Sequence, residues 1–230
     1  MKKLFLAAAV ALSCFLPGKA QEFFSTADAD YLFNFGARIG INTSNRTVAH
    51  MPGQMWNSNS WGLGFDAGVV ADINLKNFIS LQPGFFFESR SGAFAYKTLG
   101  SGPDARDIIQ LGKGRQYLFS IPLLVSVHFN ITDRLRWDVD FGPYLQFVLK
   151  STFNGKFIYP LTTFGGNIEY FDNPKSSVFD IGLKMGSGLT LFEHYYLGVH
   201  YMAGLCNAWD PGKLGGRNKG WVFTIGYTFY

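Results

Sequence analysis

Cysteine and histidine are scarce in this chain of 230 residues, which contains two cysteines and four histidines. Cys14 lies in an N-terminal segment that we expect to be removed, so the mature chain keeps only Cys206 and forms no intrachain disulfide. No pair of Cys or His residues has the spacing of a metal site. We therefore expect no disulfide framework, no bound metal and no cofactor.

Long apolar runs are also missing beyond the N-terminus. The one run, at 4–16, follows two lysines and is closed by small residues up to Ala20, as in a secretory signal peptide. We expect cleavage after Ala20, which divides the chain into a signal peptide at 1–20 and a mature domain at 21–230. A lipoprotein acylated at Cys14 is the open alternative, because Leu12-Ser13-Cys14 loosely resembles a lipobox.

Positive charge is not in excess once the signal peptide is removed. Residues 1–20 include three lysines and no acidic residue, so the formal net charge falls from +4 to +1. The basic character of the precursor therefore does not indicate an anionic partner, and we expect no nucleic acid. Without a second apolar run of membrane length, a mature chain in a membrane must cross it as β-strands.

Residues 220–230 alternate with the period of a β-strand. Large apolar side chains occupy one side, and small or polar residues occupy the other. The large residues are Trp221, Phe223, Ile225, Tyr227 and Phe229. Such a strand is typical of a lipid-facing barrel wall. We expect Ile225, Tyr227 and Phe229 to form the signal that the barrel-assembly machinery recognises during insertion.

Eight segments show strand patterns, at 32–42, 61–73, 78–90, 117–129, 136–150, 178–191, 195–206 and 220–230. Long and short connections alternate between them. This predicts an all-β fold, an eight-stranded antiparallel up-and-down transmembrane β-barrel with long outer loops and short periplasmic turns. An even number of strands places both mature termini in the periplasm. We expect a monomer in the bacterial cell outer membrane, with outer-membrane lipid as its partner.

Each predicted strand divides into an outward apolar row and an inward row of small or polar residues. The inward row contains charges of both signs, which a narrow lumen must pair. The predicted lumenal polar network consists of Arg38, Asp66, Glu88, Arg90, Lys150, Asp180, Lys184 and His200, with Asp72, Asp138, Asp140 and His128 in the same row. A salt-bridged plug is the simpler interpretation, and a polar path for protons or solutes is the alternative.

A soluble lipocalin-like barrel or a β-sandwich would also alternate and would also follow a signal peptide. Aromatic residues at the beginnings of the predicted strands favour a membrane barrel instead, because they would form girdles at the two interfaces of the bilayer. These residues are Trp61, Tyr117, Trp137, Tyr195 and Trp221.

Short motifs follow one another in order along the mature chain: Leu81-Gln82-Pro83-Gly84-Phe85, Ile121-Pro122-Leu123-Leu124, Gly142-Pro143-Tyr144, Phe179-Asp180-Ile181-Gly182, and Tyr201 with Gly204-Leu205. In these motifs the chain resembles the PorT-like outer-membrane β-barrel proteins of Bacteroidetes. The resemblance implies the barrel fold. The founding member is tied to secretion and maturation of cell-surface proteins by the type IX system, so the resemblance also implies an accessory role with a secretion or envelope protein partner. Ser120 and Thr190 stand where the family favours acidic residues, and no specific role is carried over.

Catalysis has candidate residues but no local motif. His200 is predicted to face the lumen, with Asp66, Asp180 and Ser120 as candidate partners. His128 is predicted near the periplasmic end, beside Asp72 or Asp138. A general base and a nucleophile must lie within hydrogen-bond reach of each other. We expect both histidines to be structural and the protein to have no enzymatic activity.

The predicted outer loops carry aromatic residues, many of them in 151–177. These loops either form a contact patch for a partner or extend the barrel wall as β-hairpins. Asn154-Gly155 and Gly165-Gly166-Asn167 suit the tight turns of such hairpins. The first functional hypothesis is a non-enzymatic structural or interaction barrel, the second is a barrel that binds or transports a small hydrophobic ligand or solute, and the third is a lipid-modifying enzyme.

Overall fold

The computed structural model describes residues 23–29, 31–48, 54–98, 108–158, 179–206 and 216–229. These residues form eight strands, which are β1 (Phe33–Val48), β2 (Gln54–Lys76), β3 (Ile79–Thr98), β4 (Ile108–Thr132), β5 (Leu135–Ile158), β6 (Phe179–Leu191), β7 (Tyr195–Gly204) and β8 (Gly216–Phe229). Both the predicted signal peptide at 1–20 and Cys14 within it lie outside the described residues. No helix among the described residues is long and apolar enough to cross a membrane.

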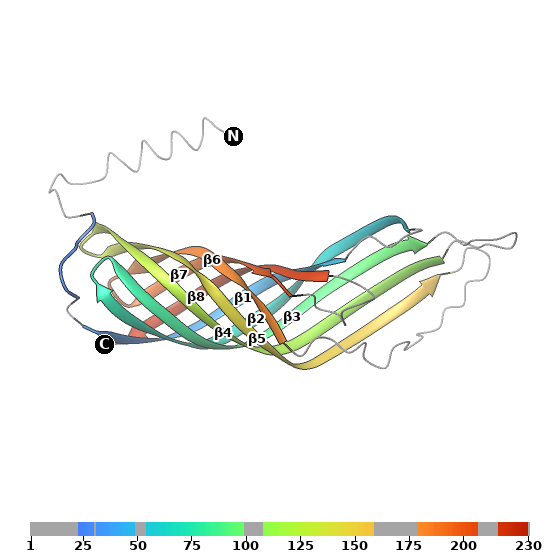
Figure 1. Cartoon of the computed structure of the whole chain (residues 1–230), viewed down its shortest axis with the longest axis horizontal. Helices are drawn as coiled ribbons and strands as arrows, with labels where there is room; N and C mark the ends of the chain where they lie inside the picture. Colours follow the sequence, from blue (N-terminus) through green and yellow to red (C-terminus); the bar gives the residue numbers. More distant parts are fainter. Residues whose placement is uncertain are drawn as a thin grey trace, which may run out of the picture.

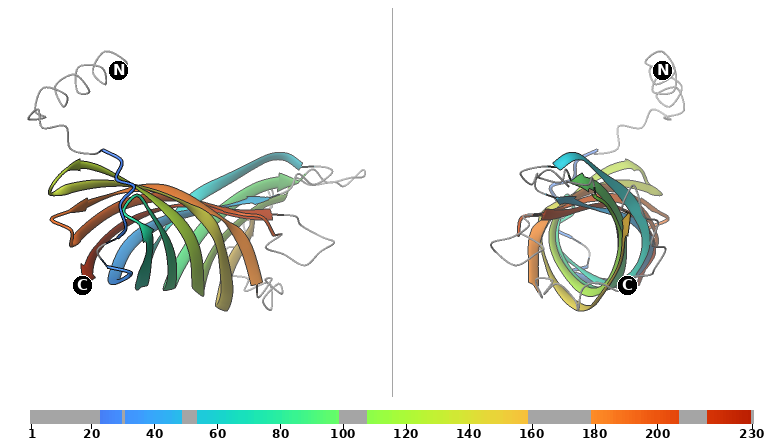
Figure 2. Two further views of the ribbon diagram at one scale, coloured as in Figure 1. Left: turned by 60° about the vertical axis from the view of Figure 1, so that its left-hand side comes forward. Right: turned by 90° about the vertical axis from the view of Figure 1, so that its right-hand side faces the viewer.

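The eight strands close into one barrel. Each strand pairs antiparallel with the next in the sequence, and β8 returns to pair with β1 from Phe35↔Phe229 to Val48↔Gly216. The view along the barrel shows the closed ring (Figure 2). The predicted eight-stranded antiparallel up-and-down barrel is therefore confirmed. Closure leaves no unpaired strand edge along the shared length of the wall.

The two ends of the barrel differ. Three short turns, at 77–78, 133–134 and 192–194, gather at one end, and the last described residue of β8 lies there too (Figure 1). At the opposite end β2, β3, β4 and β5 extend well beyond β6, β7 and β8 (Figure 1). We call these the turn end and the loop end. The asymmetry follows from strand length, since β2 to β5 have 20 to 25 residues and β6 to β8 only 10 to 14.

Much of the sequence predicted as outer loops is strand. Asn154 and Gly155 lie inside β5, opposite Lys113 and Gly112 of β4, so their prediction as a hairpin turn is wrong. A tight-turn dipeptide is also compatible with a strand when its neighbours pair continuously, and here they do. The interpretation that the loops extend the barrel wall holds for residues 151–158, which pair with β4, whereas Gly165-Gly166-Asn167 lies outside the described residues.

The outward and inward rows follow the predicted alternation along most of each strand. Outward apolar residues are exposed, as with Leu63 at 69% and Ile39 at 58%, while the inward Tyr144 is 1% exposed. On this outer wall, β1, β6, β7 and β8 border a shallow apolar hollow of about 710 Å³. Its lining includes Ile39, Ile41, Leu189, Leu197, Val199 and Ile225. An apolar exterior around a polar interior is the inverse of a soluble barrel and is suited to lipid.

Aromatic side chains form two bands on the outer wall. Near the turn end, Trp137 packs against Phe129 at 5.2 Å between ring centres. Toward the loop end, Tyr117 stacks on Phe87 at 6.2 Å and Trp221 packs on Tyr201 at 4.9 Å. Trp61, Tyr117 and Trp221 were predicted at strand beginnings. They lie several residues inside β2, β4 and β8 instead, because these strands continue past the band.

A β-bulge in β5 changes the side on which Lys150 lies. Leu118 pairs with Val148, but the next residue, Tyr117, pairs with Lys150, so Leu149 is inserted without a partner. An extra residue shifts the two-residue alternation by one position. Lys150 therefore shares the outer face with Tyr117 and is exposed, and its prediction as a lumenal residue is wrong.

The segment before β1 forms a strap across the turn end (Figure 1). Phe24 packs on Phe78 at 4.4 Å between ring centres, and the backbone N–H of Asn130 donates to the carbonyl of Phe23. The Lys76 ammonium donates to Asp28, and this contact lowers the pKa of the Asp28 carboxyl. The strap thereby joins the β2–β3 turn to the end of β4 and covers part of the mouth.

Candidate functional site in the barrel lumen

The lumen collects the polar residues that the inward rows predict. Seven of the eight predicted network residues have buried side chains, namely Arg38, Asp66, Glu88, Arg90, Asp180, Lys184 and His200. Lys150 is the exception because of the bulge. The structure groups the seven, together with other inward residues, into layers along the barrel axis.

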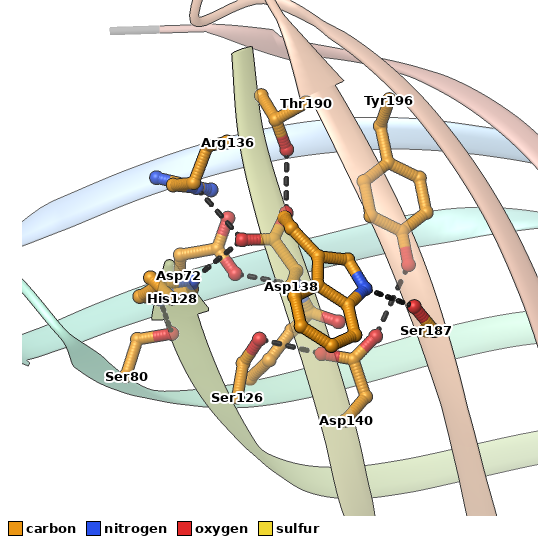
Figure 3. A network of polar contacts seen from close by, with 12 residues as sticks. Asp72, Ser80, Ser126, His128, Arg136, Asp138, Asp140, Ser187, Thr190 and Tyr196 are labelled. Carbon is orange, nitrogen blue, oxygen red and sulfur yellow. Dashed lines mark hydrogen bonds and ion pairs between the residues drawn. The ribbon is translucent and has the colours of Figure 1, made fainter. Parts of the chain in front are cut away.

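The layer nearest the turn end is organised by Asp138 (Figure 3). Its Oδ1 accepts from His128 Nδ1 at 2.7 Å and from Arg136 Nε at 2.8 Å, and its Oδ2 accepts from Thr190 Oγ1 at 2.6 Å. Four strands meet at this carboxylate when Ser80 is included, since its hydroxyl lies 2.9 Å from His128 Nε2. A buried carboxylate with this many donors is well compensated for its loss of water.

The second layer is organised by Asp140, the next inward residue of β5 (Figure 3). Ser126 Oγ donates at 2.5 Å to Oδ1, while Tyr196 OH at 3.1 Å and His200 Nε2 at 2.8 Å contact Oδ2. The Arg38 guanidinium lies 4.1 Å from the centre of the Tyr196 ring, as in a cation–π contact. The partner of His200 is therefore Asp140, and the predicted partners Asp66, Asp180 and Ser120 are wrong.

Glycines on intervening strands make these contacts across the lumen geometrically feasible. Gly186 lies between Asp140 and His200 in the register, pairing with both, and Gly226 likewise lies between Arg38 and Tyr196. A Cβ on Gly186 would overlap the His200 ring, and one on Gly226 would overlap the Arg38 side chain. Because glycine has no side chain, a residue on the strand before it can reach across the glycine to a residue on the strand after it.

An apolar layer follows toward the loop end. Tyr144, Met202 and Val222 form one buried cluster, and Phe86, Val70, Leu118 and Leu124 are buried in the same lumen. The Lys184 ammonium lies 5.2 Å from the centre of the Phe86 ring. Between this layer and the Asp140 layer the cavity lined by Arg38, Phe86, Lys184, Tyr196 and His200, among others, has only about 10 Å³. One water molecule needs about that volume, so the middle of the lumen is filled by side chains.

The layer nearest the loop end is organised by Arg90. Its guanidinium donates to Glu88 at 2.6 Å, to Gln146 Oε1 at 2.9 Å and to Met202 Sδ at 3.2 Å. Gln146 in turn donates to Ser120 at 3.3 Å. Ser120 and Thr190, the two departures from the resembling family, are thus both members of the lumenal hydrogen-bond network.

The remaining predicted charges flank this layer. Asp66 lies directly opposite Glu88 in the β2–β3 register and within electrostatic reach of Arg90 and Lys184. Asp180 accepts from Asn218 Nδ2 at 3.0 Å. Two cations among three carboxylates offset the repulsion between the neighbouring Asp66 and Glu88, as expected where buried charges of both signs share a narrow lumen.

Ser80, His128 and Asp138 have the distances of a nucleophile, base and acid set. The serine oxygen lies 2.9 Å from one ring nitrogen and the carboxylate lies 2.7 Å from the other. Chemistry at such a set requires substrate at the serine oxygen. Ser80 is 0% exposed, and its hydroxyl is held inside the wall by the histidine. Ser80 and Asp138 contact the two ring nitrogens of His128, so the histidine joins β3, β4 and β5.

A polar cavity of about 430 Å³ lies at the turn end, under the strap. It is lined by Asn34, Lys76, His128, Arg134, Arg136 and Glu193, among others. The cavity ends at the Asp138 layer, because His128, Arg136 and Thr190 line it and also contact that carboxylate. The mouth at the turn end is open to water, whereas the Asp138 layer and the layers between it and the loop end are buried. Among the residues that the structure describes, no group of three His, Cys, Asp or Glu side chains is placed to hold a metal ion.

A family model described as outer membrane protein beta-barrel domain matches residues 20–210. The chain belongs to this family. It is therefore a bacterial outer-membrane β-barrel, and its apolar outer wall faces lipid. No curated protein matches the chain.

Solved barrels are similar to this member of the family at low sequence identity. One is Ail, the attachment invasion locus protein of Yersinia pestis, in complex with the heparin analogue sucrose octasulfate, with 15% identity, 86% of this chain and 100% of that chain covered, and a TM-score of 0.42. Another is OprG from Pseudomonas aeruginosa, with 15% identity, coverage of 91% and 100%, and a TM-score of 0.37. A third is Neisserial surface protein A, with 11% identity, coverage of 85% and 97%, and a TM-score of 0.36.

The Asp140–His200 contact depends on Gly186, which gives a direct test. We expect Gly186→Ala to displace His200 and to lower the free energy of unfolding by about 1–3 kcal/mol, as overpacking does. Urea unfolding in lipid vesicles, followed by tryptophan fluorescence, measures the change. The control is Gly92→Ala, because the nearest atom to its added Cβ is 4.0 Å away. Equal stability of the two variants would contradict the role given to Gly186.

Proposed function

We propose that the protein is a non-conducting, non-enzymatic outer-membrane barrel with a structural or interaction role. The observation that carries this proposal is the filled lumen, in which the space between the Asp140 layer and the apolar layer is only about 10 Å³. Eight strands enclose a space that side chains can fill. The apolar layer between the charged layers adds to the barrier against ion passage, because an ion would lose its hydration water at Phe86 and Met202.

The filled lumen predicts electrical behaviour in planar bilayers. We expect the wild-type barrel to give no steady conductance steps, since no continuous water path crosses the apolar layer. Phe86→Ala combined with Met202→Ala removes two buried side chains of that layer and should produce small, discrete steps. The matched control is Phe85→Ala, which removes the neighbouring ring from the lipid-facing wall, where it is 48% exposed. Steady steps in the wild type would revive the polar-path hypothesis.

A non-enzymatic role is proposed despite the Ser80–His128–Asp138 set. The support is burial, because the serine oxygen lies inside the wall and cannot meet a substrate without local opening. We expect a fluorophosphonate probe to leave Ser80 unlabelled in the folded barrel, as judged by intact mass. A mutant with Ser80→Ala provides the control for labelling elsewhere. Stoichiometric labelling that disappears in this variant would support the lipid-modifying enzyme instead.

The orientation is part of the same proposal. We place both mature termini and the three short turns in the periplasm, with the loop end outside the cell. Short turns on one side and longer connections on the other support this assignment, since bacterial barrels have short periplasmic turns. The last outward residues of β8, Ile225, Tyr227 and Phe229, then lie toward the periplasm, where the barrel-assembly machinery would meet them during insertion.

An accessory role in secretion or surface assembly is the narrower proposal, supported by the resemblance to PorT-like proteins. It predicts a reproducible, near-stoichiometric protein partner after crosslinking in native outer membranes, recovered through an affinity tag inserted in 207–215. The matched sample is the same tagged barrel without crosslinker. Recovery of the barrel alone, at the size of a monomer, would favour a stand-alone barrel and count against the secretion role.

A further inference from the structure

The outer wall at the loop end carries charge of one sign. Beyond the aromatic residues Tyr117 and Trp221, the outward charged side chains that the structure describes are all cations. They are Lys113, Arg115, Lys150, Arg217 and Lys219, and we call them the cationic collar. At the turn end the described charges are mixed, with Lys76, Arg134 and Arg136 beside Asp28, Asp133 and Glu193.

Three collar residues are neighbours on β4 and β5. Arg115 and Lys113 are alternate residues of β4 and share its outer face, about 7 Å apart along the strand. Lys150 pairs with Tyr117, which makes it the diagonal neighbour of Arg115 at about 7–8 Å. The unpaired Leu149 puts Lys150 there, because without the bulge its side chain would point into the lumen. A bulge that moves a cation beside two others increases repulsion unless an anion lies among them.

The described part of the chain supplies no such anion. The inward carboxylates lie on the other side of the wall, and the ion pairs of the described residues involve none of the three collar residues on β4 and β5. Arg115 and Lys150 are both exposed. Among the described residues, no side chain of the wall balances their charge.

The lipid-facing wall begins directly below the three cations. Tyr117 stacks on Phe87, and Phe87 packs on Phe119 at 6.0 Å between ring centres. On the far side, the Lys219 ammonium lies 5.9 Å from the centre of the Trp61 ring. Aromatic bands mark the interface between hydrocarbon and head groups, so the collar stands at head-group level. Anionic lipid head groups are present at this level of a membrane and attract cations near its surface.

We propose that the Lys113, Arg115 and Lys150 face binds the phosphate groups of a phosphorylated glycolipid in the adjacent leaflet. Lysine and arginine both donate to phosphate oxygens, and cations near a membrane surface are drawn to anionic head groups. The acyl chains of the same lipid would lie on Phe87, Phe119 and their neighbours. The inference requires a barrel in lipid and rests on the proposed orientation, in which the loop end faces the outer leaflet and its glycolipid.

The test uses the purified full-length barrel in mild detergent, with lipid binding followed by native mass spectrometry. The probe is a bisphosphorylated lipid A, compared with the same glycolipid after removal of both phosphates. We expect Lys113→Gln/Arg115→Gln to weaken binding of the phosphorylated lipid by roughly 30-fold, since each cation contributes about fivefold. The control variant, Lys76→Gln/Arg134→Gln, removes two cations from the turn end and should leave binding within about twofold.

Heat-modifiable migration on a mild detergent gel confirms that each variant is folded, and Lys113→Arg/Lys150→Arg should bind like the wild type. Equal binding by the collar variant and the control would overturn the proposal. So would undiminished binding of the glycolipid without phosphates. Equal affinity for the phosphorylated disaccharide without acyl chains would place the ligand in solution and overturn the assignment to a lipid. Orientation is measured separately, by labelling an introduced cysteine in intact cells, so failure of the proposed orientation is distinguished from failure of lipid binding.

Discussion

Closing eight strands into a barrel leaves a lumen so narrow that its polar side chains must satisfy one another. Asp138 and Asp140 show how this is achieved. Each carboxylate receives three side-chain contacts, which come from β4, β6 and β7 and from Arg136 of β5 itself, and His128 extends the network to Ser80 of β3. Hydrogen bonds to a charged group contribute about 1.5–3 kcal/mol each, whereas a buried carboxylate without them is strongly unfavourable. These two residues therefore connect β3 to β7 through the interior as the backbone ladder does along the wall.

Side-chain size and charge divide the lumen into polar layers and one apolar layer. Large inward residues such as Tyr196 and Tyr144 fill space only because glycines occupy the facing positions, as Gly188 and Gly182 do. The aspartate layers secure the turn-end half, and Arg90 with Glu88 secures the loop-end half. Between them the apolar layer excludes water. A barrel built in this way has its buried polar network inside the lumen and leaves its turn-end cavity and its outer wall accessible.

The outer wall is shaped by irregularities as much as by the regular pattern. One inserted residue in β5 removes Lys150 from the lumen, where it would have added a buried cation, and puts it on the surface beside Arg115. The long strands β2 to β5 carry that surface past the aromatic band, while β6 to β8 end sooner. At the loop end, the barrel wall therefore continues on one side only, along β2 to β5, and its outer face is positive. At the turn end, the strap covers part of a mouth that carries charges of both signs.

The sequence by itself determined the number of strands, their approximate centres, and which side of each strand is apolar, because alternation is a local property of an extended chain. It also determined which charges could enter the lumen, with the exception of Lys150. Only the tertiary structure decided the partners, since the meeting of Asp140 and His200 requires the register of β5, β6 and β7 and the space left by Gly186. It decided the strand ends as well, because Asn154 and Gly155 continue a strand only when β4 lies beside them to complete the hydrogen bonds.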